Sequence, residues 1–296
     1  MVELYGPGGV EWLERLPSLI ADYAGRWSLT VLPSFEPLSY NYVAPAVRAD
    51  GTDVVLKLGV PNPELLTEIE ALRLYGGRGI VQLLEADPDQ GALLLERLKP
   101  GTPLARLADD AQATSIAAQV MRQLWRPVPG EYPFPSVADW AAGLGRLRRH
   151  FGGGSGPFPT HLVEAAEVLF RELIGSMGEP VLLHGDLHHE NILAAERQPW
   201  LALDPKGLVG EAAYEVGALL RNPIPEIVTR PHVDRVMARR VDQLSEELGL
   251  DRERLLGWGL AQAVLAAWWS FEDHGHYYEP FIACAEHLAA VARRSG

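Results

Sequence analysis

The chain has 296 residues, of which 47% are hydrophobic and 22% are charged, the composition of a globular protein with enough apolar material for a core. Its formal net charge of −13 argues against a nucleic-acid partner, which would require a basic face. The charge is compatible with a cationic substrate, although acidity for solubility alone is the simpler cause of most of it. The sequence shows no basic and apolar leader and no apolar stretch of membrane-spanning length, so we expect no signal peptide and no membrane partner.

The chain contains a single cysteine, Cys284, which cannot form a disulfide within the chain. A protein without disulfides suits the reducing cytoplasm. We therefore expect a cytoplasmic protein. As a separate expectation, the protein acts as a monomer or weak dimer.

The first third of the sequence is rich in predicted strands. In chain order it predicts a helix over 8–27, a strand over 27–33, two strands over 41–59, a helix over 63–79 and a hairpin over 80–98. Asp50-Gly51 separates two apolar runs, and this dipeptide is typical of a hairpin turn. Pro17 lies inside the first helical pattern and complicates it.

The helix predicted over 63–79 has an apolar side and a glycine stop. Gly76 and Gly77 end the pattern, because glycine readily adopts the left-handed conformation that follows many helices. The residues expected on its apolar side are Leu65, Leu66, Ile69, Leu72 and Leu74.

Helices dominate after residue 98. They are predicted over 104–125, 136–150, 160–176, 231–248, 252–270 and 281–294, with another beginning after 211. This order indicates an α+β fold with two lobes, a β-rich lobe over 1–98 and a helical lobe over 99–296. A cleft between two lobes is a common place for a small-molecule site.

Three oxygen-bearing side chains follow two short apolar strands. Asp186 and Asn191 lie in a loop after the strand 181–183, and Asp204 ends the strand 200–204. If the two strands are adjacent, all three side chains lie at one end of a hairpin. Aspartate and asparagine oxygens suit Mg²⁺. The remaining aspartate can orient a hydroxyl, which is the layout that phosphoryl transfer needs.

A metal-bound triphosphate also needs a cation, and Lys57 is the candidate. It interrupts the apolar strand DVVLKLG. A lysine on an edge strand that points into water is the ordinary alternative. If Lys57 is buried instead, it needs an acidic neighbour, and the next helix offers Glu68 and Glu70, which cannot share a helix face. We favour Glu68, with Glu70 as the alternative.

The motifs HGDLHHEN and LALDPKG resemble the catalytic and metal-binding motifs of the aminoglycoside phosphotransferases, which have a protein-kinase-like fold. The closer resemblance is to the streptomycin 6-phosphotransferase and hydroxyurea-resistance kinase branch. Further matching stretches, in the family's order, are 39–58, 70–87, 93–104 and 208–223. The resemblance implies a bilobal kinase-like fold, ATP and Mg²⁺ as cofactors, and phosphorylation of a hydroxyl on an aminoglycoside such as streptomycin.

The resemblance also implies roles for the motif residues. Asp186 would be the catalytic aspartate, which orients the acceptor hydroxyl or accepts its proton. Asn191 and Asp204 would hold Mg²⁺. Lys57 would bind the α and β phosphates, steadied by Glu68.

The nucleotide would be held by a loop and a hinge. The residues implied are Ser39 and Asn41 in the loop and 96–99 in the hinge, among them Glu96 and Leu98, whose backbone would bind adenine. The loop is not the glycine-rich type of protein kinases, so its polar side chains and backbone amides would have to contact phosphate. Lys206 either neutralises the transferring group or points to solvent, and the sequence leaves both open.

Histidines near Asp186 raise the alternative of a zinc site. His184 and His188 are four apart, which would suit a helix. However, Gly185-Asp186 after an apolar strand indicates a loop, so we interpret His184 as a support for that loop. His188 is either a phosphate contact or a surface residue.

The helix after 211 carries polar residues near the same motifs. Glu211 and Glu215 suit a helix N-terminus, and Glu215 can also brace the catalytic loop. We interpret the stretch Arg221-Asn222-Pro223 as the end of this helix.

Acidic residues near the C-terminus offer contacts for a cationic substrate. They are Glu272, Asp273 and Glu279, within the aromatic-rich stretch 267–280. Aromatic walls and carboxylates would suit ammonium or guanidinium groups, but a helix end with core tryptophans explains the same pattern. The rival functions are a kinase of another sugar or amino alcohol, a catalytically silent nucleotide-binding relative and, most weakly, a zinc hydrolase.

Overall fold

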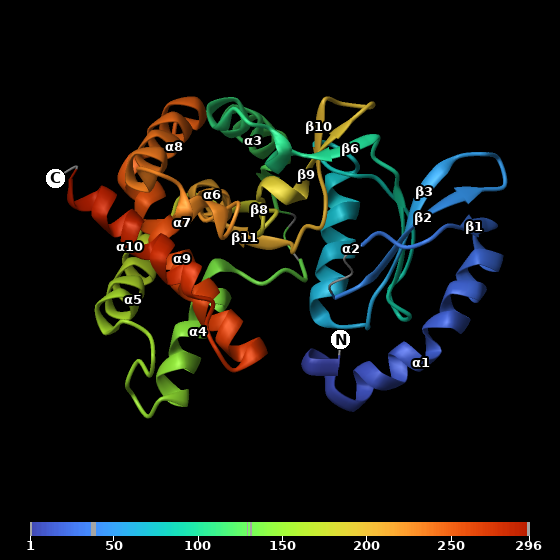
Figure 1. Cartoon of the computed structure of the whole chain (residues 1–296), viewed down its shortest axis with the longest axis horizontal. Coiled ribbons are helices and arrows are strands. Elements are labelled where there is room, and N and C mark those ends of the chain that lie inside the picture. The colour runs from blue at the N-terminus through green and yellow to red at the C-terminus, as the bar shows by residue number, and fades with distance from the viewer. Residues whose placement is uncertain (1, 37–39, 129, 131, 295–296) are drawn as a thin grey trace. The chain divides into compact units, whose positions relative to one another are not determined.

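The computed structural model describes residues 2–36, 40–128, 130 and 132–294 (Figure 1). The chain divides into two units. The N-terminal unit comprises Met1–Gly101 and Ala194–Lys206, and the C-terminal unit comprises Thr102–Leu193 and Gly207–Gly296. Within the described part of the chain, none of the helices has the length and apolarity needed to cross a membrane.

The N-terminal unit is built on a five-stranded antiparallel sheet in the order β1-β2-β3-β5-β4. The strands are β1 (Leu29–Val31), β2 (Tyr42–Arg48), β3 (Asp53–Leu58), β4 (Leu83–Asp87) and β5 (Ala92–Glu96). Both predicted hairpins are confirmed: β2 pairs with β3 across the Asp50-Gly51 turn, and β4 pairs with β5. In the resulting register Lys57 lies between Val43 and Leu93 on the central strand.

Two helices belong to the N-terminal unit. Helix α1 (Val2–Arg26) continues through Pro17 and is kinked at Gly6. Its residues Trp12, Leu19 and Tyr23 are buried in one cluster with sheet residues. Helix α2 (Pro63–Tyr75) begins at Asn62, whose side chain accepts a hydrogen bond from the Leu65 N–H. It ends at Gly76 in the left-handed conformation, as the sequence predicts.

The predicted apolar side of α2 is partly wrong. Leu65, Ile69 and Leu72 are buried, but the side chains of Leu66 and Leu74 are 43% and 38% exposed. Residues at i, i+4 and i+7 share one face of a helix, whereas the position next to i points about 100° away. Apolar character alone therefore placed two exposed leucines on the wrong side.

The segment Ala194–Lys206 returns to the N-terminal unit. It contains the second half of β9 (Ile192–Ala195) and all of β10 (Trp200–Ala202), which pair with each other. Ala202 forms a parallel bridge with Ile80, which precedes β4. The division expected from the sequence, with lobes over 1–98 and 99–296, places this segment in the second lobe.

The C-terminal unit consists mainly of helices. They are α3 (Asp110–Leu124), α4 (Val137–His150), α5 (Thr160–Gly175), α6 (Ala212–Leu220), α7 (Glu226–Thr229), α8 (Val233–Leu248), α9 (Arg252–His274) and α10 (Glu279–Arg293). Helix α9 packs against α5, α6 and α10. Every residue from Leu255 to Trp268 is buried, which is expected for a helix surrounded by other helices.

Short elements complete the fold. They are β6 (Pro100–Pro103), β7 (Arg126–Pro127), β8 (Val181–Leu183), β11 (Leu208–Gly210) and the 3-10 turns Leu104–Arg106 and His189–Asn191. Strand β8 lies between β11 and β7, whereas β10 pairs with β9. The expectation that the strands before Asp186 and Asp204 form one hairpin is therefore wrong, because β7 and β11 occupy both edges of β8.

Two glycines in hairpin turns provide a matched test of the sheet. Gly51 and Gly91 both have positive φ, but a Cβ at Gly51 would meet nothing, whereas one at Gly91 would lie 2.2 Å from the Gly59 carbonyl oxygen. We expect Gly51→Ala to lower the free energy of unfolding by about 1 kcal/mol through backbone strain. Gly91→Ala should cost clearly more, about 3 kcal/mol. Urea denaturation would measure both, and equal losses would contradict the close approach.

Candidate active site

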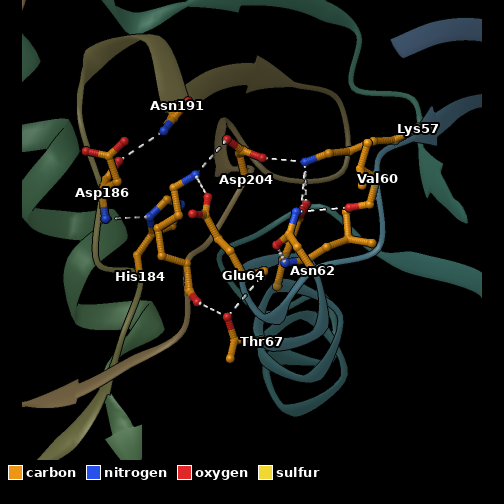
Figure 2. A network of polar contacts seen from close by, with 12 residues as sticks. Lys57, Val60, Asn62, Glu64, Thr67, His184, Asp186, Asn191 and Asp204 are labelled. Carbon is orange, nitrogen blue, oxygen red and sulfur yellow. Dashed lines mark hydrogen bonds and ion pairs between the residues drawn. The ribbon is translucent and has the colours of Figure 1, made fainter. Parts of the chain in front are cut away.

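Lys57 is the centre of a buried polar network in the N-terminal unit. It is 5% exposed, and its Nζ donates to both carboxylate oxygens of Glu68, at 2.7 and 2.8 Å. It also donates to Asp204 Oδ1 at 2.5 Å (Figure 2). Glu68 is thus confirmed as the acidic partner, while Glu70 pairs with Arg73 on the exposed side of α2.

The two carboxylates determine the charge of Lys57. Burial alone would lower the pKa of this ammonium, but Asp204 and Glu68 outweigh that effect and raise its pKa above the usual range. Burial raises the pKa of Glu68, and the nearby Lys57 opposes that rise. Lys57 is therefore a permanent cation held in place, not a lysine that points into water.

The segment that carries Asp204 is fastened to α2. Asp204 has a φ of 62°, an unusual conformation for a residue other than glycine. The Thr67 hydroxyl donates to the Lys206 carbonyl oxygen at 2.7 Å, and Lys206 Nζ donates to Glu64 at 2.5 Å. Lys206 Nζ also lies 3.8 Å from Asp204 Oδ2. Lys206 therefore pairs with α2, and each Asp204 oxygen faces an ammonium group.

The loop after β8 is organised from within the C-terminal unit. The carboxylate of Glu215, on α6, accepts hydrogen bonds from the N–H groups of His184 and Gly185, at 2.6 and 2.9 Å. His184 is fully buried, and its Nδ1 accepts from the Asp186 N–H at 3.3 Å. Asn191 Nδ2 donates to the Asp186 carbonyl at 3.0 Å (Figure 2). His184 and Glu215 thus support the loop as predicted.

The side chain of Asp186 has a partner that sequence reasoning missed. Arg221 Nη2 donates to Asp186 Oδ1 at 2.8 Å, and His188 Nε2 lies 3.5 Å from Oδ2. The sequence alone indicates for Arg221 only a place at the end of a helix. The available clue was an arginine at the end of the apolar run in AAYEVGALL, where a cation needs a buried counter-charge.

The nearby histidines each have contacts that explain them without zinc. His184 supports the Asp186 N–H, and His188 Nδ1 accepts from the Glu190 N–H at 3.2 Å. His189 is buried, with Nε2 3.5 Å from Arg240 Nη2. Burial first, and then the Arg240 charge, lowers the pKa of His189 to about 3, so its ring is neutral. The three rings act as parts of the loop.

A family-level comparison now identifies the chain, since residues 33–274 match the aminoglycoside/hydroxyurea antibiotic resistance kinases. The chain belongs to this family. The streptomycin 6-kinase of Streptomyces glaucescens is 36% identical, with 93% of this chain and 90% of that protein covered. The hydroxyurea phosphotransferase of Kitasatospora aureofaciens is 37% identical, with coverage of 90% and 77%.

A solved structure confirms the fold of this kinase. A thermostable mutant of an aminoglycoside phosphotransferase, in ternary complex with ADP and hygromycin B, aligns with a TM-score of 0.67 and 15% sequence identity. The alignment covers 93% of this chain and 98% of that one. The predicted α+β, protein-kinase-like fold is confirmed, and the family match makes the chain a phosphotransferase of the family's kind.

The predicted hinge of the kinase is held by a second arginine that sequence reasoning missed. Arg197 donates to both carboxylate oxygens of Glu96, at 2.9 and 2.8 Å, and to the carbonyl oxygens of Gly77 and Ile80, at 2.7 and 2.8 Å. The Glu96 N–H donates to the Gln82 carbonyl. Adenine would therefore have to bind other backbone groups of 96–99, such as those of Leu98.

The predicted nucleotide loop is described only in part. Ser39 lies outside the described residues. Asn41 packs on Gly59, just after β3, where an added Cβ would lie 2.2 Å from Asn41 Oδ1. Asn41 therefore lies beside Gly59, two positions after Lys57 in the chain, while its role in binding phosphate stays a prediction.

The predicted substrate carboxylates lie near the end of α9 and the start of α10, and all are exposed. Glu272 accepts two hydrogen bonds from Arg146, at 2.7 and 2.8 Å. Both residues line a groove of about 740 Å³. Trp268 is 2% exposed and stacks on Phe271, as the core interpretation of the tryptophans expects. The roles of Glu272, Asp273 and Glu279 remain predictions.

Glu215 makes the stability of this kinase depend on pH. Burial raises its pKa from 4.5 to about 7, although the two backbone N–H groups oppose the rise. The folded protein therefore holds the proton of the Glu215 carboxyl more tightly than the unfolded chain does. The protonated carboxyl stabilises the folded state fully below pH 4.5, and this contribution to the free energy of unfolding is lost as the pH rises through 7. The loss should approach about 3 kcal/mol.

Denaturant unfolding across this pH range would measure the effect. Glu215→Gln cannot ionise, so its stability should fall less steeply, even though a lost acceptor for backbone N–H lowers its overall stability by about 1–3 kcal/mol. The exposed Glu196→Gln is the matched control and should keep the wild-type slope. A Glu215→Gln slope equal to wild type would refute the assignment.

Proposed function

We propose that the protein is an ATP- and Mg²⁺-dependent O-phosphotransferase that phosphorylates a hydroxyl of a small cationic molecule, with streptomycin as the first candidate. The observation that carries the proposal is the buried Lys57–Glu68–Asp204 network. An ammonium group placed beside a partly exposed carboxylate is suited to holding the phosphates of a metal-bound nucleotide. We propose that the protein acts in the cytoplasm as a monomer or weak dimer.

The nucleotide would be held by residues of the N-terminal unit. Lys57 would donate to the α and β phosphates while Glu68 keeps its position. Asn41 and Ser39 would contact phosphate, and backbone groups of 96–99 would contact adenine. Support comes from the antiparallel register, which fixes Lys57 on the central strand of the sheet.

Mg²⁺ would be held by Asn191 and Asp204, as the resemblance of their motifs implies. The donor set fits, because a carboxylate and an amide oxygen are the hard ligands that Mg²⁺ prefers. Asp204 is accessible, with 33% of its side chain exposed. Asn191 uses its Nδ2 on the Asp186 carbonyl, which leaves the amide oxygen to serve as a ligand. When bound, Mg²⁺ supplies positive charge that offsets the phosphates.

Asp186 would orient the acceptor hydroxyl for in-line attack and receive its proton. Its backbone is fixed on both sides, by His184 and Asn191, so the carboxylate projects from a rigid loop. Catalysis in such a site comes mainly from positioning and charge stabilisation. The loop therefore needs to be rigid, and the buried Glu215 provides that rigidity.

The acceptor is proposed from the named relatives and from charge. Asp273 and Glu279 are exposed carboxylates that could bind the guanidinium groups of streptomycin. Glu272 would have to share its carboxylate with Arg146. Hydroxyurea is the second candidate, because a hydroxyurea phosphotransferase is 37% identical to this chain. A kinase of another sugar or amino alcohol, or a silent nucleotide binder, are the further alternatives.

A panel of acceptors would test the proposed function. Purified protein with ATP and Mg²⁺ should consume ATP in the presence of streptomycin, and mass spectrometry should show a product that has gained one phosphoryl group. Turnover with hydroxyurea alone would select the second candidate. Turnover only with a sugar or amino alcohol would indicate a metabolite kinase, and nucleotide binding without turnover on any acceptor would sink the proposal.

Two alanine variants should separate chemistry from nucleotide binding. Asp186→Ala should lower kcat by about 1,000-fold or more while ATP still binds, because only the acceptor loses its contact. Asp204→Ala should abolish Mg²⁺-dependent nucleotide binding in calorimetry, because the metal loses a ligand. Wild-type turnover by the Asp186 variant would show that another group orients the hydroxyl.

A further inference from the structure

The carboxylate of Asp186 is held by a buried chain of hydrogen bonds. Arg221 caps the C-terminal end of α6 and is 7% exposed. Its Nη2 donates to Asp186 Oδ1 at 2.8 Å, and its Nη1 donates to Gln262 Oε1 at 2.6 Å. One planar guanidinium thus joins the loop to helix α9.

Gln262 fixes the orientation of that guanidinium. It is 2% exposed, and its Nε2 donates to the Tyr214 carbonyl at 2.7 Å, so its Oε1 is the atom turned toward Arg221. Gly217 makes room for it, because a Cβ at that position would lie 2.6 Å from Gln262 Cδ. Neither the amide nor the guanidinium can rotate without breaking a buried hydrogen bond, which is costly.

This arrangement makes the two oxygens of Asp186 unequal. The buried Arg221 guanidinium donates to Oδ1, while 27% of the Asp186 side chain is exposed. A free carboxylate can rotate about its terminal torsion, but one held by a planar donor in a fixed position cannot. The other oxygen, Oδ2, lies 3.5 Å from His188 Nε2, and the fixed guanidinium determines the direction in which it points.

A contribution to stability is a weak explanation for the presence of the Arg221–Asp186 ion pair. A buried arginine must be desolvated, and a buried ion pair often contributes no more than well-packed apolar residues would. What the Arg221–Asp186 pair does provide is a single orientation for the Asp186 carboxylate, the group that performs the chemistry.

We propose that Arg221 is a positioning residue, which acts through Asp186 by fixing its carboxylate in one orientation for the acceptor hydroxyl, and that Gln262 supports it in this role. The inference rests on the proposed function, in which Asp186 is the group that orients the acceptor.

A double-mutant cycle tests this role. Arg221→Met should lower kcat by about 100-fold, with the KM for ATP unchanged, because a displaced catalytic group costs turnover and not nucleotide binding. In an Asp186→Ala background the same change should have almost no further effect, because its target is gone. A purely structural role would lower activity by the same factor in both backgrounds and would overturn the proposal.

Further variants keep the test decisive if Arg221→Met does not fold. Arg221→Lys retains the positive charge but loses the planar arrangement of donors on the guanidinium. It should therefore recover part of the turnover that Arg221→Met loses. Gln262→Met leaves Asp186 and Arg221 in place but frees the guanidinium, and it should lower kcat by about 10-fold without changing the KM for ATP. Wild-type kcat in both variants would refute the proposal.

The control is Arg148→Met, which removes an arginine that binds Glu167 through two hydrogen bonds in the same unit. It should leave kcat unchanged. The failure of the proposed function looks different: there Asp186→Ala itself keeps wild-type turnover. Loss of turnover in Asp186→Ala, together with full turnover in Arg221→Met, Arg221→Lys and Gln262→Met, would sink only the inference.

Discussion

A lysine ammonium buried in an apolar strand is the constraint on which the candidate site depends. Lys57 lies between the buried residues Leu56 and Leu58, where an unpaired charge would be very costly. Glu68 and Asp204 compensate for that cost, and in doing so they bring α2 and the segment 194–206 to one point of the sheet. The same contacts that make burial tolerable therefore bring together the groups that we propose to bind phosphate and metal.

The charges of this network do not balance within it. Lys57 and Lys206 face three carboxylates, those of Glu64, Glu68 and Asp204. The carboxylates are in excess, and the most accessible of the residues that contact Lys57 is Asp204. A divalent cation bound there would relieve that excess, while Lys57 stays available for phosphate. Under the proposed function, the excess of carboxylates is a physical reason why a metal-bound nucleotide would bind better than a free one.

The sequence predicted those features whose cause is local. Lys57 was identifiable because a lysine interrupts an apolar strand, and Glu68 because only one of two nearby glutamates can face it. Arg197 and Arg221 were missed because their partners, Glu96 and Asp186, are 101 and 35 positions away in the chain. The pairing of β8 was misjudged for the same reason, since strands that are adjacent in sequence need not pair when other strands compete for their edges.

The segment 194–206 shows how a short stretch of chain becomes part of a site far from it in sequence. Arg197 fastens its first half to the predicted hinge and to the turn after α2, and Ala202 bridges to Ile80. Thr67 and Glu64 fasten its second half. With both ends held by the N-terminal unit, Asp204 keeps its unusual backbone conformation beside Lys57. The position of this carboxylate is thus a property of the N-terminal unit itself, and a substitution anywhere along these contacts acts on Asp204 through its backbone.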